Sequence, residues 1–160
     1  TTHNIHAMPN TYTQLYIHII YAVKYRDRVI NKSWKESLNQ YTTGIIQKNG
    51  HKLLAINGAS DHLHVFIGLK PHQAISDLIQ DVKAGSSKWV NDNKLALGRF
   101  SWHAGYAAFS YSHSQIDLVI KYINNQEQHH AQRTFREEYL EFLNKFEVEY
   151  SDAYLFEFFE

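Results

Sequence analysis

The chain has 160 residues, 44% of them hydrophobic, and its acidic and basic residues balance to a formal net charge of zero. This length and composition predict one compact domain with a core and exclude a chain that is disordered throughout. The absence of cysteine excludes disulfides, thiolate metal sites and cysteine nucleophiles, and it fits a reducing compartment. No apolar run approaches the roughly 18 residues of a membrane span, and no secretory signal pattern opens the sequence.

Charge is unevenly distributed along the chain. Residues 133–160 carry three basic and eight acidic residues, so this tail has a net charge of −5 and the remainder has +5. A basic body permits a polyanionic partner on one face, although solvated surfaces often show such an imbalance. Residues 1–7 are polar, and we interpret them as a remnant that precedes a native start at Met8.

The first predicted element is a strand over residues 14–23. It is rich in β-branched and aromatic residues, which favours burial on both faces. His18 lies inside this strand, where a hydrogen-bonded core histidine is favoured over a functional one. A small basic cluster of Lys24, Arg26 and Arg28 follows the strand.

A helix and a hairpin are predicted next. Ser33 and Glu36 have the spacing of a capping box at the start of a helix over residues 33–49. Strands over residues 52–56 and 61–69 are joined by a short Asn-Gly turn, which is typical of a hairpin.

Two histidines open the second strand of this hairpin. Side chains alternate between faces along a strand, so His62 and His64 point the same way, with roughly 7 Å between their origins. Two imidazoles at that separation can converge on one metal ion. A purely structural pair is the open alternative.

A second helix is predicted over residues 73–91, with small and basic residues over 83–88. Because a glycine inside a helix costs about 1 kcal/mol, Gly85 indicates either a close approach by another element or a weak point in a surface helix.

The remaining elements place two polar side chains together. Tyr122 and Gln126 are four residues apart in a helix predicted over residues 114–129, so they share a face beside its apolar stripe. The other predicted elements are a strand over residues 100–111, a helix that follows the capping-box pair Thr134 and Glu137, and an acidic, aromatic tail over residues 150–160.

The order of elements predicts the fold class. Strand, helix, strand, strand, helix, strand is the split βαβ order of a ferredoxin-like α+β fold. We expect a central antiparallel sheet of about four strands, helices on one side, and an extra C-terminal helix and tail. The first and third strands would lie in the middle, so the histidine strand would be a rigid platform for a site.

These motifs together resemble one known family. His62-Leu63-His64 is similar to the HUH motif of the single-tyrosine transposases of small insertion sequences, and of their relatives, the REP-associated tyrosine transposases. The run from Tyr122 to Gln126 resembles the family's catalytic helix, Tyr25-Arg26 its turn after the first strand, and residues 83–88 its segment rich in lysine, glycine and serine. The resemblance spans about residues 11–128, within a catalytic domain over 8–130. Residues 131–160 would pack on that domain or on a partner subunit.

The resemblance implies a chemistry and a set of residues. The enzyme would cleave and rejoin single-stranded DNA at element ends that carry hairpins, with Tyr122 as the nucleophile of a 5′-phosphotyrosine intermediate. His62, His64 and Gln126 would hold Mg²⁺ or Mn²⁺. The candidate DNA contacts are Lys24, Arg26, Lys83, Ser86, Ser87 and Lys88. For each of the four basic residues, an ordinary solvated charge is the open alternative. A homodimer with no membrane partner, at the nucleoid of a bacterial or archaeal cytoplasm, is the implied setting.

Three other readings stay open at this point. A domesticated relative that acts on palindromic repeats would share the same chemistry. A ferredoxin-like module that binds RNA or another nucleic acid without catalysis would stack bases on exposed aromatics of its sheet, whereas this chain has His62 and His64 there. A structural metal-binding domain would leave the spacing of Tyr122 and Gln126 as coincidence.

Overall fold

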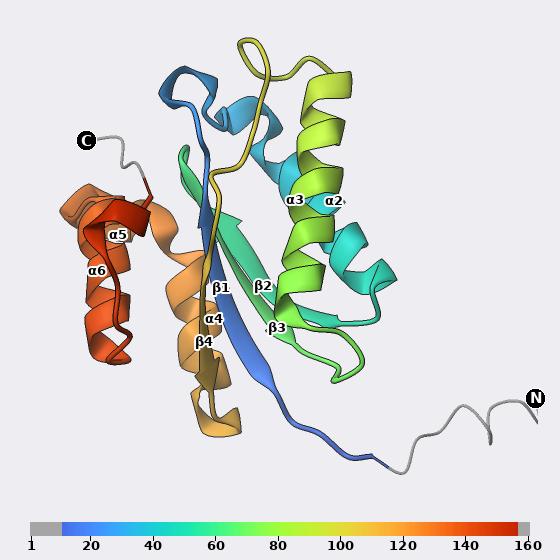
Figure 1. Ribbon diagram of the computed structural model, residues 1–160, viewed down its shortest axis with the longest axis vertical. Helices are drawn as coiled ribbons and strands as arrows, with labels where there is room; N and C mark the ends of the chain where they lie inside the picture. The colour runs from blue at the N-terminus through green and yellow to red at the C-terminus, as the bar shows by residue number, and fades with distance from the viewer. Residues whose placement is uncertain (1–10, 157–160) are drawn as a thin grey trace, which may run out of the picture.

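The computed structural model describes residues 11–156, and the expectations for residues 1–7 and for the last four residues lie outside this range. Its centre is a four-stranded antiparallel sheet in the order β2-β3-β1-β4, as Figure 1 shows. The predicted ferredoxin-like sheet is confirmed, with the histidine strand in a central position. The strands are β1 (Tyr16–Ala22), β2 (Lys52–Gly58), β3 (His62–Gly68) and β4 (Ala107–Tyr111).

The two central strands bury both of their faces. In β1, Ile19 and Tyr21 pack in the core on one side of the sheet, whereas Ile20 packs in a second core on the other side. In β3, Leu63 belongs to the first core and Phe66 lies on the opposite face. Because successive side chains alternate, apolar residues at both parities require cover on both faces of the sheet.

Helices α2 (Lys32–Lys48) and α3 (Ile75–Asp92) cover the first face. The predicted capping box at Ser33 is wrong, because the helix begins one residue earlier. Asn31 is the N-cap residue, and its side chain accepts a hydrogen bond from the backbone N–H of Ser33 at 2.9 Å. An asparagine in this position satisfies one of the free N–H groups at the helix start.

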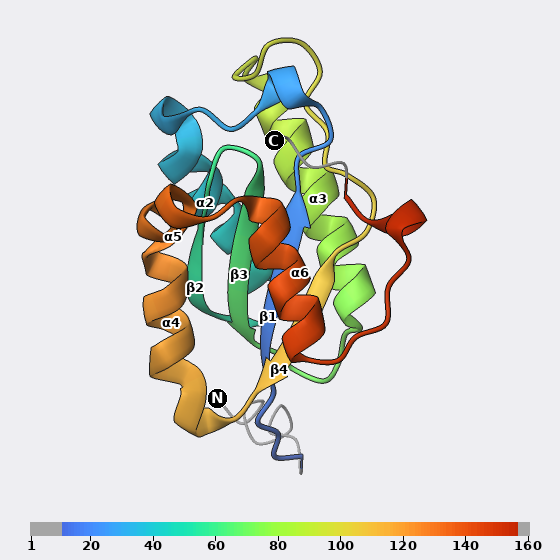
Figure 2. The same cartoon turned by 90° about the vertical axis from the view of Figure 1, so that its left-hand side faces the viewer.

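Helices α4 (Ile116–Asn124), α5 (Gln126–Gln132) and α6 (Phe135–Lys145) lie on the opposite face, toward the viewer in Figure 2. The expectation of helices on one side therefore holds only for α2 and α3. The helix predicted over residues 114–129 is divided, since Asn125 leaves the helical conformation between α4 and α5. The cap predicted at Thr134 is confirmed: its hydroxyl accepts from the backbone N–H of Glu137.

The strand predicted over residues 100–111 is shorter than expected. Only Ala107–Tyr111 pairs with β1, and Trp102 forms an isolated bridge with Val23. Between them Gly105 has a φ of +87°, which breaks the extended run. The short 3₁₀ helices η1 (Arg26–Arg28), η2 (His113–Gln115) and η3 (Asp152–Tyr154) complete the described chain. Within residues 11–156 no helix has the length and apolar character to cross a bilayer.

The close approach predicted at Gly85 is confirmed. A Cβ at this position would lie 2.8 Å from Cδ1 of Ile45 on α2, whereas a Cβ at Gly44 would meet nothing within 4 Å. Gly85 therefore lets α2 and α3 pack closely.

These two glycines predict opposite responses to substitution. Gly44→Ala should stabilise the protein by about 0.5–1 kcal/mol, because alanine is the better helix former. Gly85→Val should destabilise it by about 1–3 kcal/mol through overpacking against Ile45. Urea unfolding of both variants measures the difference, and equal shifts for the two would contradict the close approach.

Candidate active site

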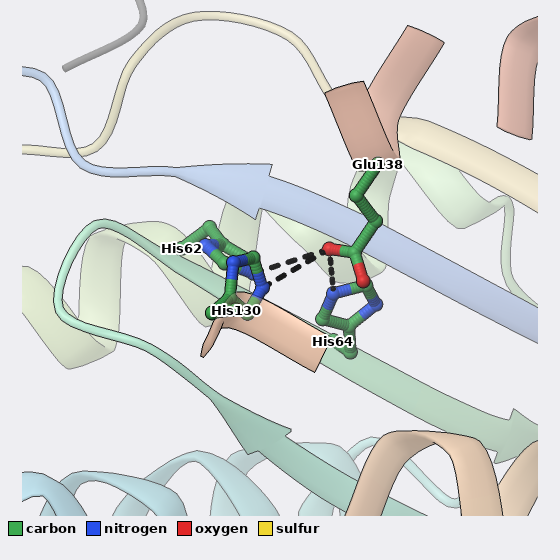
Figure 3. Close-up of side chains that lie close together, drawn as sticks. All are labelled: His62, His64, His130 and Glu138. Atoms are coloured by element: carbon green, nitrogen blue, oxygen red, sulfur yellow. Dashed lines mark hydrogen bonds and ion pairs between the residues drawn. The ribbon is translucent and has the colours of Figure 1, made fainter. Parts of the chain in front are cut away.

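The histidines of β3 meet two side chains from the C-terminal helices. His62 and His64 are fully buried on the face covered by α5 and α6 (Figure 3). Oε1 of Glu138, on α6, lies 2.9 Å from Nε2 of His64, 3.5 Å from Nε2 of His62 and 3.4 Å from Nε2 of His130, on α5. One ligand atom from each of these four residues lies within 4.8 Å of the others. The set has the residue types and the spacing of a metal site.

The other ring nitrogen of each β3 histidine has its own partner. Nδ1 of His62 lies 2.7 Å from the carboxylate of Asp61, and Nδ1 of His64 lies 2.8 Å from Nε2 of His18 on β1. These contacts fix the rings so that both Nε2 atoms face the cluster, which is how outer residues orient metal-ligating histidines. His18 is therefore a buried and hydrogen-bonded histidine, as predicted, that also orients a site residue.

Burial and charge set the protonation of the cluster. Burial lowers the pKa of His64 to about 4 and the pKa of His18 well below its ordinary value, so both rings are neutral at pH 7. Burial also disfavours charged His62, but the carboxylates of Asp61 and Glu138 outweigh it and raise the pKa of that ring. Burial alone would raise the pKa of Glu138, whereas its close contacts with the surrounding imidazoles lower it strongly. Glu138 is thus a buried, ionised carboxylate.

Tyr122 lies at the edge of this cluster. Its hydroxyl donates to Oε2 of Glu138 and accepts a hydrogen bond from Nη2 of Arg133 at 2.7 Å. Burial and then the charge of Glu138 raise the pKa of Tyr122, while Arg133 opposes that shift. The ring is half-buried and faces a pocket that is also lined by His18, Tyr111 and Arg133. The hydroxyl is therefore oriented by two charged groups beside an opening to solvent.

Gln126 reaches the cluster by a different route. It is fully buried as the first residue of α5, and its side-chain oxygen lies 3.1 Å from Nε2 of His130. Its Nε2 has no hydrogen-bond partner within residues 11–156. Because α4 ends before Asn125, Tyr122 and Gln126 lie on two different helices. The side chain of Tyr122 contacts Glu138, whereas the side chain of Gln126 contacts His130.

Two of the candidate DNA contacts lie at the same end of the sheet as the histidines. Lys24 and Arg26 are exposed and lie two and four residues after Ala22, the last residue of β1, which pairs with His62 in the sheet. The carbonyl of Asp61 accepts a hydrogen bond from the N–H of Val23 at 2.8 Å. This bond places the basic turn, which carries Lys24 and Arg26, beside the start of β3.

The other candidates on α3 make internal contacts. Lys83 donates to the carbonyls of His103 and Gly105, and burial lowers its pKa to about 8. Ser86 is buried, and its hydroxyl accepts a hydrogen bond from the indole N–H of Trp102 at 2.9 Å. The hydroxyl of Ser87 donates to the carbonyl of Lys83, and the exposed Lys88 pairs with Asp92.

Sequence reasoning missed several residues of the cluster. Glu138 carried a signal, since it lies among Phe135, Tyr139 and Phe142 in the apolar stripe of α6, where an acid is unexpected. Asp61 directly precedes the histidine pair, but the sequence pattern assigns it no role. His130 and Arg133 carried no comparable signal, because their contacts arise only when α5 and α6 fold back over the sheet.

Comparisons with known proteins identify the family of this chain. Residues 11–126 match the sequence profile of the family described as "Transposase IS200 like". The ISDra2 transposase TnpA of Deinococcus radiodurans is 26% identical over 118 residues, which cover 71% of this chain and 84% of that protein.

Two solved structures share the fold. A candidate transposase from Deinococcus radiodurans R1 has a TM-score of 0.59 at 24% identity, covering 74% of this chain and 95% of that one. A REP-associated tyrosine transposase bound to a REP hairpin has a TM-score of 0.55 at 11% identity, covering 74% of this chain and 70% of that one.

The fold is therefore that of the tyrosine transposases. The matched profile covers most of the sequence, and the chain belongs to the IS200-like transposase family. Membership in this family makes the protein a transposase, an enzyme that acts on DNA. The match ends at Gln126, so Arg133 and Glu138 lie beyond the matched region.

Proposed function

We propose that this transposase cleaves and rejoins single-stranded DNA at insertion-sequence ends through a 5′-phosphotyrosine on Tyr122. The observation that carries the proposal is the position of the Tyr122 hydroxyl, which contacts Glu138 while the same carboxylate contacts His64. A tyrosine beside a cluster of metal-ligating residues has the two parts that phosphodiester transfer needs, a nucleophile and a site for charge stabilisation.

The proposed step conserves the phosphoester. The Tyr122 oxygen forms a bond to phosphorus, the bond to the 3′ oxygen breaks, and a free 3′-hydroxyl leaves with a proton. Attack by a 3′-hydroxyl on the phosphotyrosine reverses the step and joins a new DNA end. The tyrosine hydroxyl is a weak nucleophile as long as it keeps its proton, and Glu138 is the carboxylate to which that proton is hydrogen-bonded.

A divalent ion is part of the proposal, and the residues present fit one. His62 and His64 turn their Nε2 atoms into the cluster, and Nε2 of His62 is buried without a hydrogen bond among the described residues. Both would hold Mg²⁺ or Mn²⁺, with the side-chain oxygen of Gln126 as the ligand that family resemblance assigns. The ion would polarise the phosphoryl oxygens and orient the scissile bond.

A hairpin-bearing single strand is the proposed substrate. The similar REP-associated transposase is bound to a hairpin in its solved structure, and this chain has a basic turn at the histidine end of its sheet. Lys24 and Arg26 are the proposed phosphate contacts there. Lys88 can leave its exposed pair with Asp92, because surface ion pairs are weak. Lys83 and Ser86 would act by holding the segment over residues 102–105 in place. Ser87 bonds within its own helix.

One experiment tests the proposed chemistry. The protein is incubated with Mn²⁺ and labelled single-stranded element ends, and a denaturing gel then separates protein from DNA. We expect a band that carries both label and protein, with the modified peptide containing Tyr122 by mass spectrometry. Cleavage that leaves no covalent adduct would indicate hydrolysis by water and would refute the proposal.

A second candidate shares this site. A nuclease that acts on palindromic repeats is favoured by the REP hairpin in the similar structure. Repeat hairpins and element ends offered in the same adduct assay distinguish the two substrates. From the family resemblance we also propose that the activity takes place at the nucleoid, in the cytoplasm of a bacterium or an archaeon.

We also propose a homodimer, because family resemblance implies two subunits. Light scattering at micromolar concentration should report about twice the chain mass of 18.8 kDa. The contacts of Tyr122 with Glu138 and Arg133 arise within one chain. A monomer with full cleavage activity would refute the dimer and leave the proposed chemistry in place.

A further inference from the structure

The C-terminal helix α6 contributes a carboxylate to the centre of the site. Glu138 is fully buried, and its two oxygens have different neighbours. Oε1 is surrounded by three imidazole nitrogens, at 2.9 Å from His64, 3.5 Å from His62 and 3.4 Å from His130 (Figure 3). Oε2 accepts the hydrogen bond of the Tyr122 hydroxyl. The carboxylate therefore connects the histidines to the nucleophile.

The distances fit a shared ion. Ligand atoms about 2.1 Å from one cation lie roughly 3.0 Å apart in octahedral and roughly 3.4 Å apart in tetrahedral coordination. The measured separations between Oε1 and the histidine nitrogens, 2.9–3.5 Å, fall around these values. Small movements of the side chains would thus place an ion among them.

Gln126 is less well placed for the same role. Its oxygen lies 3.1 Å from Nε2 of His130, and that nitrogen lies 3.4 Å from Glu138. Gln126 thus reaches the cluster through His130, whereas Glu138 contacts both β3 histidines directly.

We infer that Glu138 is a further oxygen ligand of the catalytic ion, beside His62 and His64. This inference rests on the proposed function for the identity of the ion as a divalent metal. Two imidazoles and one carboxylate leave coordination positions open for a phosphate. The second oxygen of Glu138 holds the Tyr122 hydroxyl next to that position. The ligand comes from a helix beyond the family-matched region, which ends at Gln126.

Calorimetry with MnCl₂ alone tests the ligand set. Glu138→Gln removes the charge with little change of shape and should weaken Mn²⁺ binding by about 100-fold, because loss of a ligand should cost at least as much as loss of an outer residue. Glu138→Asp keeps the charge and should recover part of the affinity. Gln126→Ala should weaken binding less than Glu138→Gln does. The matched control is Glu137→Gln, the exposed neighbour on the same helix, which should leave the affinity within about twofold.

Two results would overturn the inference. Unchanged Mn²⁺ affinity in Glu138→Gln, with a normal thermal unfolding curve, would show that this carboxylate is not a ligand. Tighter binding in that variant would show that Glu138 occupies the place of the ion and competes with it. If Glu138→Gln does not fold, Glu138→Asp decides: its affinity must fall below that of the wild type. Because no DNA is present, a failure of the phosphotyrosine proposal would appear only in the adduct assay.

Discussion

Tyr122→Phe should abolish the covalent protein–DNA adduct and lower strand cleavage by on the order of 10⁴-fold or more, the effect expected when a nucleophile is removed. The substitution deletes only the hydroxyl, so the ring keeps its stacking on His129 at a centroid distance of 4.2 Å. Glu138 loses one hydrogen bond but keeps its histidine partners, and Arg133 keeps its ion pair with Glu141. The variant should therefore fold, bind Mn²⁺ and bind hairpin DNA.

Tyr111→Phe is the matched control for this experiment. Tyr111 lines the same pocket as Tyr122 and is also half-buried, but it comes from β4 and makes edge-on ring contacts with Phe66 and Phe146. Its loss should leave adduct formation within a few-fold of the wild type. An adduct that persists in Tyr122→Phe, or disappears in Tyr111→Phe, would assign the nucleophile to another tyrosine and move the active site.

The sheet and the histidine pair were predictable because they depend on short-range patterns. Alternation along β3 places His62 and His64 on one face whatever the rest of the chain does. The order of strands and helices then fixes which strands are central. The mid-helix glycine was informative for the same reason, because Gly85 by itself indicates that a neighbour approaches the helix closely. In the structure that neighbour is Ile45.

The carboxylate was not predictable, because its position depends on long-range packing. An apolar stripe shows that α6 is buried, but it does not show which face of the sheet α6 covers. The stripe of α6 also buries Glu138, and only the folded chain shows that three imidazoles compensate this burial. The division between α4 and α5 likewise depends on a conformation of Asn125 that helical periodicity does not show.

The double substitution His62→Ala and His64→Ala should abolish Mn²⁺ binding in calorimetry and also lower the stability of the protein. Both imidazoles are fully buried, and they are two of the three that contact Glu138. Removing one side of a buried ion pair leaves an uncompensated charge and typically costs about 3–5 kcal/mol. The free energy of unfolding, measured in urea, should therefore fall by about this amount. The cavities left by the two rings contribute to this loss of stability.

A triple variant separates the charge from the cavities. Adding Glu138→Gln to the double substitution removes the carboxylate that lost two of its partners, so the triple variant should be more stable than the double, by roughly 1–3 kcal/mol. The triple variant should still bind no Mn²⁺, because the ring nitrogens remain absent. A triple variant no more stable than the double would show that Glu138 does not depend on these histidines for its charge. Mn²⁺ binding that survives the double substitution, in a protein that still unfolds cooperatively, would place the metal elsewhere in the chain.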